Sequence, residues 1–148
     1  MVTRDVDRGY RKVMQALSAR SRHVVTVGIH SEEGAAGKAQ GPTIAEVAEI
    51  NEFGLGVPAR PVISVYADQR GTELVALMRD RAAAGLKQGV PIAQSLDVVA
   101  QVAAGEIQER YAAGVPPPNS PATIARKGSS VPRINTGQER AAIRGRVR

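Results

Sequence analysis

The sequence predicts an α+β fold, with a small mixed or antiparallel β-sheet packed against two long antiparallel helices and an N-terminal helix. Three observations support this prediction: a run rich in β-branched residues near residue 25, two long apolar stripes at helical spacing between residues 68 and 114, and a loss of periodicity after Gly114. The 148 residues suit one core, built from small aliphatic side chains because aromatic residues are only 3% of the chain.

The first elements follow from apolar spacing. Residues 5–20 carry apolar side chains at helical intervals and predict the N-terminal helix. Residues 23–29 are rich in valine and predict a strand. Residues 31–42 contain glycine and alanine without an apolar period and predict an exposed loop.

A second short helix is predicted from its capping residues. Thr43 stands three residues before Glu46, which is the reciprocal capping pattern of a helix start, and Gly54 provides a left-handed end. Two prolines then precede residues 62–66, which predict a short or edge strand.

The two long helices are predicted over residues 68–88 and 92–114. Gly89 ends the first and Pro91 suits the first turn of the second. Because the connection is so short, we expect the two helices to pack antiparallel.

The last quarter of the chain differs in composition. Residues 1–114 carry thirteen Lys/Arg and thirteen Asp/Glu, whereas residues 115–148 carry seven Lys/Arg against Glu139 and five of the nine prolines. We therefore predict a core domain over residues 1–114 and an extended, basic, proline-rich arm over residues 115–148 that docks on the core or on a neighbouring subunit. Within the arm, residues 123–128 suit one helical turn, and residues 131–135 and 142–147 suit short strands.

No catalytic, cofactor or metal site is predicted. The chain has no cysteine, and the glycine-containing segment at residues 34–38 lacks the spacing and the hydroxyl of a phosphate-binding loop. His23 and His30 lie seven residues apart on opposite faces of the predicted strand, so they cannot share a metal through it. Glu46, Glu49 and Glu52 form an acidic helix face, for which a solvated or intersubunit surface is favoured over acid–base catalysis. We expect a protein that is not an enzyme.

A soluble protein that is made in the cytoplasm is expected as well. The sequence has no run of 18 apolar residues and no apolar stretch near Met1 that would resemble a signal peptide. We therefore expect no association with a membrane.

Two segments resemble one protein family. Residues 44–54 (IAEVAEINEFG) followed by residues 57–62 (VPARPV) resemble the "A-x-I-x-E-F-G … I-P-x-R-P-F" segment of neck and tail-completion proteins of tailed bacteriophages. Residues 117–128 (PPNSPATIARKG) followed by residues 132–137 (PRINTG) are similar to the "L-S-x-x-T-x-x-R-K-G … P-L-I-D-T-G-x-L-x-x-S-I" ending of the same proteins. Four positions depart from that ending: Arg133 and Glu139 stand where it has leucine, Asn135 where it has aspartate and Ala142 where it has serine. Since the ending is more charged here, we expect the last ten residues to become ordered against a partner.

The resemblance implies a structural virion protein that is made in the host cytoplasm and joins head to tail. Symmetry then requires a closed ring of copies, and six would match the tail whereas twelve would match the portal. The implied partners are the portal or connector and the tail terminator or tail tube proteins, with no small-molecule substrate and with contact to DNA in the lumen if the basic arm faces it. The residues expected at partner or subunit interfaces are Phe53, Arg60, Pro117, Pro118, Arg126, Lys127, Arg133, Arg140 and Arg144.

Two of these residues have a specific expected role. Arg60, between two prolines, suits a bidentate pair with a carboxylate, and Phe53 suits either a core position or an intersubunit anchor. An alternative function also stays open at this point. The arm could belong to a small basic nucleic-acid-binding protein that makes non-specific phosphate contacts.

Overall fold

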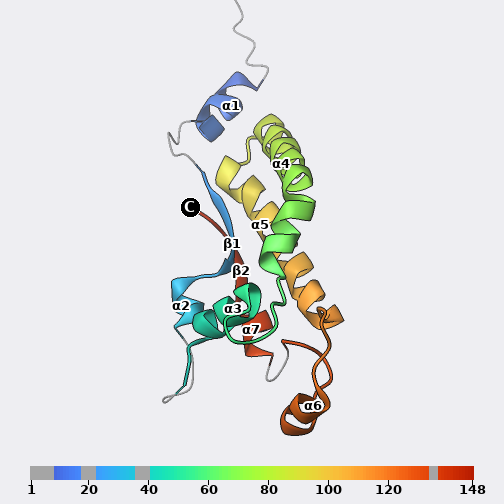
Figure 1. The fold of residues 1–148 in the computed structure, drawn as a ribbon. Helices are drawn as coiled ribbons and strands as arrows, with labels where there is room; N and C mark the ends of the chain where they lie inside the picture. The colour runs from blue at the N-terminus through green and yellow to red at the C-terminus, as the bar shows by residue number, and fades with distance from the viewer. Residues whose placement is uncertain (1–8, 18–22, 36–40, 134–136) are drawn as a thin grey trace, which may run out of the picture.

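The computed structural model describes residues 9–17, 23–35, 41–133 and 137–148. In chain order its elements are α1 (Tyr10–Leu17), β1 (Val25–Ile29), α2 (Ser31–Gly34), α3 (Ile44–Phe53), α4 (Ile63–Gln88), α5 (Ile92–Ala113), α6 (Pro121–Lys127), α7 (Gln138–Ala141) and β2 (Ile143–Val147). Helices α4 and α5 run along the length of the molecule, with the two strands on one side and with α3, α6 and α7 gathered at one end (Figure 1). The mixed helix and strand content confirms the predicted fold class.

The α4–α5 hairpin forms the centre of the fold, as the apolar stripes predict. Gly89 takes a left-handed conformation with a φ of 73°, and its N–H donates to the carbonyls of Gly85 and Leu86. The helices approach closely where Gly85 faces Ser95, because a Cβ on Gly85 would stand 2.0 Å from the Ser95 Oγ. The absence of a side chain at Gly85 therefore permits this close approach near the turn.

Helix α4 begins at Ile63, five residues before the predicted start, and the predicted strand over residues 62–66 is wrong. The Glu52 carboxylate accepts hydrogen bonds from the backbone N–H groups of Val62 (3.0 Å) and Ser64 (2.9 Å), which the helix itself leaves unpaired. In addition, Val62 and Tyr66 are spaced to face the same side of the helix, and both are buried. A cap from a distant residue and a helical apolar face therefore override the strand propensity of the β-branched residues.

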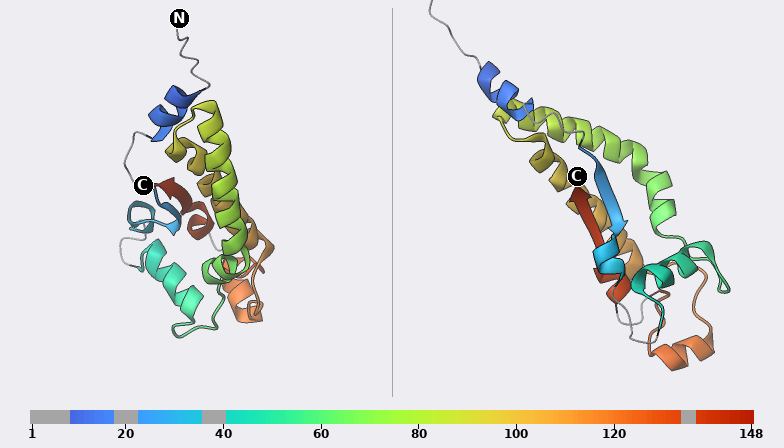
Figure 2. Two further views of the ribbon diagram at one scale, coloured as in Figure 1. Left: turned by 90° about the horizontal axis from the view of Figure 1, so that it is seen from above. Right: turned by 90° about the vertical axis from the view of Figure 1, so that its left-hand side faces the viewer.

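The sheet has two antiparallel strands, β1 and β2, with Val25 opposite Val147 and Ile29 opposite Ile143. It lies against α5, as the right-hand view of Figure 2 shows. Ile143 is completely buried in the core. The core comprises Val62, Tyr66, Ala103, Ala104, Ile107, Tyr111 and Ile143.

Two glutamine side chains of α5 bind the backbone of β2. Gln101 donates to the carbonyl of Gly145 (3.3 Å), and Gln108 donates to the carbonyl of Ile143 (3.1 Å). The last residues of the chain, which we expected to become ordered against a partner, therefore pair within the chain itself.

The shorter elements differ in part from the sequence prediction. Residues 31–34 form α2, where a loop was predicted, and residues 131–133 form a turn in place of a strand. The predicted helical turn in the arm is present as α6, and the predicted capping pair of Thr43 and Glu46 is formed at the start of α3. Parts of the predicted N-terminal helix, of the glycine-containing loop and of the 131–135 segment lie outside the described residues. None of the helices in the described part of the chain has the length and the apolar character needed to cross a membrane.

The contact between β2 and α5 can be tested at Gly145. A Cβ at this position would stand 2.0 Å from the Ala100 carbonyl oxygen, so Gly145→Ala must displace the strand from the helix. We expect this variant to lose about 2–3 kcal/mol of unfolding free energy, measured by urea denaturation. Gly105→Ala in α5 is the control, because a Cβ there meets nothing within 4 Å; it should gain roughly 0.5–1 kcal/mol. Equal stability of Gly145→Ala and wild type would contradict the close packing of β2.

Candidate functional site

The two segments that carry the family resemblance meet at one end of the molecule. Residues 52–62 leave the end of α3 and lead into α4, and residues 115–133 leave α5 and carry α6. Both segments lie with α7 at the lower end of the view in Figure 1. Two arginines, Arg133 and Arg60, connect them.

Arg133 is the centre of this end. Its side chain is 0% exposed, and one terminal nitrogen donates to the Glu52 carboxylate (2.7 Å) and to the carbonyl of Arg60 (2.7 Å). The other terminal nitrogen donates to the carbonyl of Ala48 (3.3 Å) and to the Glu139 carboxylate. A buried cation is tolerated only with such partners, so this guanidinium fixes α3, residue 60 and α7 relative to one another. The expectation of an Arg133 that faces a partner is therefore wrong for the folded chain.

Tyr111 completes the surroundings of Arg133. The guanidinium carbon lies 4.7 Å from the centre of the Tyr111 ring. The face of an aromatic ring attracts a cation at this distance. The Tyr111 hydroxyl donates to the same Glu139 carboxylate at 3.0 Å. Burial, followed by the negative charge of Glu139, raises the pKa of Tyr111, so the hydroxyl stays a donor.

The Glu52 carboxylate serves two elements at once. It pairs with Arg133 and accepts from the backbone N–H of Val62 and Ser64 and from the Ser64 hydroxyl (2.8 Å). Burial alone would raise the pKa of Glu52, but these hydrogen bonds from Ser64, Val62 and Arg133 together hold it below its usual value. Glu52 is therefore a structural carboxylate that stays ionised.

The backbone of Arg133 is unusual as well. Its φ of 61° lies in the left-handed region, which side-chain-bearing residues rarely adopt. Such a conformation costs on the order of 1 kcal/mol and persists only where the surroundings impose it. The buried contacts of the guanidinium provide that constraint.

Arg60 fastens the proline segment to the loop before α4. Its side chain donates to the carbonyls of Pro117 (2.8 Å) and Pro118 (3.3 Å), and its own N–H donates to the carbonyl of Asn51 (2.7 Å). The expected pair between Arg60 and a carboxylate is therefore replaced by two backbone carbonyls. Pro117 and Pro118 are themselves exposed, and the Pro116–Pro117 bond is cis.

The loop that carries α6 is closed by Asn119. This side chain is buried, and its amide nitrogen lies within hydrogen-bond distance of the carbonyls of Ser129, Ser130 and Val131 at 3.5, 3.3 and 3.2 Å. Helix α6 is capped by Ser120, whose hydroxyl accepts from the Thr123 N–H. The segments just before and just after α6 are thus held together, and α6 projects from them as a compact unit.

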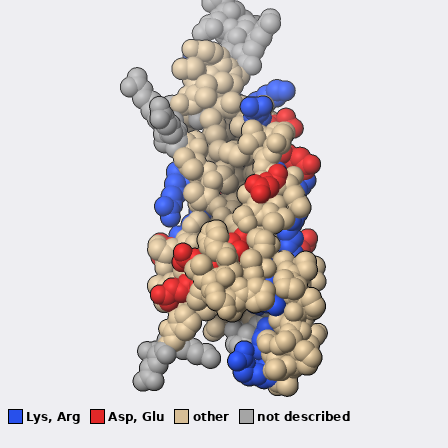
Figure 3. All heavy atoms as spheres, viewed as in Figure 1, with Lys and Arg blue, Asp and Glu red and all other residues tan. Residues whose placement is uncertain are grey.

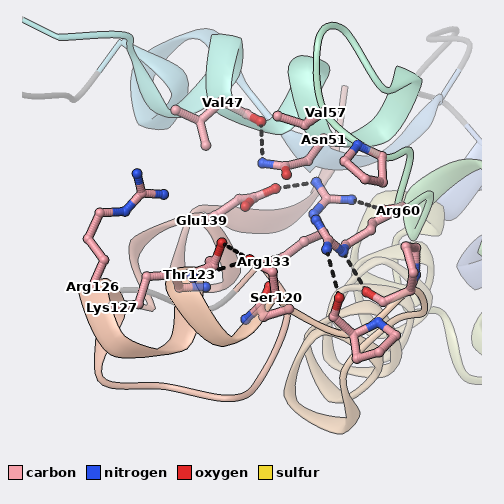
Figure 4. Close-up of a pocket in the computed structure, with 14 residues that line it drawn as sticks. Val47, Asn51, Val57, Arg60, Ser120, Thr123, Arg126, Lys127, Arg133 and Glu139 are labelled. Carbon is pink, nitrogen blue, oxygen red and sulfur yellow. Dashed lines mark hydrogen bonds and ion pairs between the residues drawn. The ribbon is translucent and has the colours of Figure 1, made fainter.

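A pocket of about 450 Å³ lies between α3 and α6. Val47, Val57, Pro58, Pro117 and Pro118 contribute apolar walls, and Arg60, Arg126 and Lys127 contribute positive charge. In Figure 4, Arg126 reaches from α6 toward α3, where Val47 lies on the opposite wall. Figure 3 shows basic side chains over α6 at this end of the molecule. The arrangement can hold an anionic group beside an apolar one.

An exposed apolar loop, comprising Phe53, Leu55 and Val57, lies next to this pocket. The three residues are 69%, 55% and 41% exposed. The chain turns sharply at Gly54, which has a φ of 73° and where a Cβ would meet Ala59 at 2.9 Å. A core position for Phe53, one of the two alternatives from the sequence, is therefore excluded in the folded chain.

The other basic residues of the arm have different surroundings. Arg140 is exposed, and Arg144 donates to the carbonyls of Ala141 and Ile143. Arg146 pairs with Glu32 and Glu33 of α2. Part of the positive charge of the arm is thus neutralised by acidic residues of the first 114.

The predicted acidic face of α3 does not act as a unit. Glu46 accepts from the Thr43 N–H (2.7 Å) in the capping box, Glu52 pairs with Arg133, and Glu49 is exposed. Among the described residues, no group of three or more histidine or acidic residues could hold a metal ion.

One further polar cluster carries no sequence signal. The Tyr66 hydroxyl donates to Glu106 (2.8 Å), which also pairs with Arg70 (2.9 Å), and Arg110 lies over the Tyr66 ring. Burial and Glu106 raise the pKa of Tyr66 to about 12. Glu106 lies 40 residues from Tyr66 and 36 from Arg70 in the chain, and no local pattern connects it to them.

No protein-family model matches this chain. Comparisons with curated proteins and with solved structures find no significant match either. The site is therefore interpreted from its own geometry and from the two sequence segments.

The coupling between Arg133 and Glu139 can be measured with two variants. Arg133→Leu leaves Glu52 and Glu139 buried without their cation and should cost about 3–5 kcal/mol of unfolding free energy. In Arg133→Leu/Glu139→Leu one of the two uncompensated carboxylates is gone and two apolar side chains face each other. We expect the double variant to be at least about 1 kcal/mol more stable than the single one in urea denaturation. A double variant that is less stable than the single one would contradict the pairing.

The lowered pKa of Glu52 predicts a pH dependence of stability. A carboxyl group whose pKa is lower in the folded state stabilises the protein above its unfolded pKa of about 4.3, and this contribution is lost as the pH falls through the folded value. Thermal unfolding of wild type should therefore shift to lower temperature between about pH 5 and pH 3, and the shift should be smaller in Glu52→Gln. Glu49→Gln, at an exposed position of the same helix, is the control and should follow wild type. Identical pH profiles for wild type and Glu52→Gln would count against this role of Glu52.

Proposed function

We propose that this chain is a structural subunit of the head–tail junction of a tailed bacteriophage, a neck or tail-completion protein and not an enzyme. The proposal starts from the two resembling segments, which are separated by more than 50 residues in the sequence. Arg60 and Arg133 join these segments into one structural unit. A resemblance carried by two segments gains weight when both build the same end of the molecule.

The observation that carries the proposal is the exposed apolar loop at this end. Phe53, Leu55 and Val57 follow one another on a tight turn, and all three are exposed in the single chain. Contiguous exposed apolar side chains mark a surface that contacts another protein. The proposed contact is an aromatic anchor that a neighbouring copy or a junction protein covers.

The assembly that follows from this role is a ring. A subunit between a portal and a tail tube repeats around their common axis through head-to-tail contacts that close. The proposed neighbours are further copies, the portal or connector, and the tail terminator or tail tube proteins. Six copies would match the symmetry of the tail, and twelve that of the portal.

A second candidate function is non-specific nucleic-acid binding by the arm. The exposed Arg126, Arg140 and Arg148 favour it. The pairing of Arg133 and Arg146 with acidic residues of the same chain weakens it, because those cations are no longer available to phosphates. We therefore rank it below the structural role.

The structural role predicts a specific defect for Phe53→Asp. The side chain is exposed, so the variant should fold, but a carboxylate at the centre of a contact would be desolvated without a partner. In the phage that encodes this chain, we expect filled heads and separate tails in electron micrographs and a titre lowered by roughly 100-fold or more.

Val75→Asp is the matched control, since Val75 is 47% exposed on α4, outside the loop of residues 53–57. We expect a titre near that of wild type. Normal titres for a folded Phe53→Asp protein, or purified virions in which mass spectrometry finds none of this chain, would refute the proposal.

A further inference from the structure

We propose that the pocket between α3 and α6 binds an acidic, extended peptide segment of a partner protein. Its carboxylates would lie at Arg126 and Lys127, and an adjacent apolar side chain would lie against Val47, Val57 and Pro58. We call this site the α3–α6 pocket. The proposal rests on the pocket alone and does not require the phage assignment.

The α3–α6 pocket carries more positive than negative residues. Four cations line it, Arg60, Arg126, Lys127 and the buried Arg133, and Glu139 is the one acidic residue among its described lining residues. Glu139 is already engaged by Arg133 and by the Tyr111 hydroxyl. The positive charge at the mouth is therefore left for a ligand to neutralise.

Lys127 shows the effect of this charge. Partial burial, followed by the nearby charges of Arg60 and Arg126, lowers the pKa of Lys127 below its usual value. Its ammonium group donates weakly, at 3.4 Å, to the carbonyl of Val131. A carboxylate in the pocket would offset the mutual repulsion of the three cations and accept charge-assisted hydrogen bonds from them.

The walls of the pocket suit an apolar side chain next to that carboxylate. Val47 and Val57 approach from α3 and the following loop, and Pro58 and Pro118 add rigid apolar faces. The volume of about 450 Å³ is within the usual range of ligand sites, about 300–1,000 Å³. An extended segment that alternates acidic and apolar residues places both kinds of side chain in such a site.

The pocket is also held in shape before any ligand binds. Arg60 fixes the proline wall through two carbonyls, and Asn119 closes the loop that carries α6. Arg133 ties the end of α3 to the segment that follows α6. A preformed site lowers the entropic cost of binding a flexible peptide.

These features favour a peptide over a nucleic acid. Duplex DNA is contacted by protruding cations and by elements that enter a groove, whereas Arg126 and Lys127 line a recess between two helices. Single strands need aromatic side chains for base stacking, and the described lining contains none.

The test is a fluorescence anisotropy titration of the full-length chain with three labelled probes. The first is an octapeptide in which three glutamates alternate with leucines, the second has glutamines in place of the glutamates, and the third is a 12-base-pair DNA duplex. We expect the acidic peptide to bind with a dissociation constant on the order of 100 μM. The glutamine peptide and the duplex should bind at least tenfold more weakly.

Variants connect this binding to the pocket. Arg126→Glu/Lys127→Glu should weaken binding of the acidic peptide at least tenfold, and the milder Arg126→Gln should weaken it severalfold, with circular dichroism as the check of folding. Arg140→Glu is the matched control, since Arg140 is an exposed cation of the same arm that does not line the pocket, and it should bind like wild type. No binding of the acidic peptide at 1 mM, equal binding of the glutamine peptide, tighter binding of the duplex, or unchanged binding by the Arg126 and Lys127 variants would each overturn the proposal.

Discussion

The structure depends on the neutralisation of one buried cation. The guanidinium of Arg133 is removed from water and compensated by two carboxylates, two backbone carbonyls and an aromatic ring. These partners come from α3, from the loop before α4, from α5 and from α7, so the position of each is tied to the others. Glu52 extends the constraint into α4, since the same carboxylate caps that helix. Loss of the cation would therefore loosen the junction of four helices and not a single contact.

This interaction also explains two departures from the phage-protein pattern. Arg133 and Glu139 both stand where that pattern has leucine, and in the sequence each looks like a charge inserted into an apolar ending. In the structure the two side chains bind each other in the buried junction. Either charge alone would be expensive to bury, whereas here Glu139 is hydrogen-bonded to Arg133, which also pairs with Glu52. Arg133 and Glu139 are thus coupled through one buried ion pair.

Local signals in the sequence were sufficient to predict the helical hairpin, the capping box at Thr43, and the helix ends at Gly54 and Gly89. Each of these features depends on residues within one or two helical turns. The start of α4 could not be predicted in the same way, since its cap comes from Glu52, ten residues earlier. The partner of β1 lies more than 110 residues away, and the partner of Arg133 in α3 lies 81 residues away. The environments of the candidate interface residues could not be predicted locally: the sequence left Phe53 open between a core position and an anchor, and the structure exposes it. Arg133 had the same sequence appearance as Arg126 but the opposite environment.

From its charge alone, the change in composition at residue 115 suggests a separate basic arm. In the structure the positive residues of this segment have a different physical role. The positive arm is complementary to acidic residues of the first 114: Arg133 pairs with Glu52, and Arg146 pairs with Glu32 and Glu33. The arm also supplies Ile143 to the core and the strand that pairs with β1. Because α3 and α6 form opposite walls of the α3–α6 pocket and are held together through Arg133 and Arg60, the shape of that pocket depends on contacts between the arm and the first 114 residues.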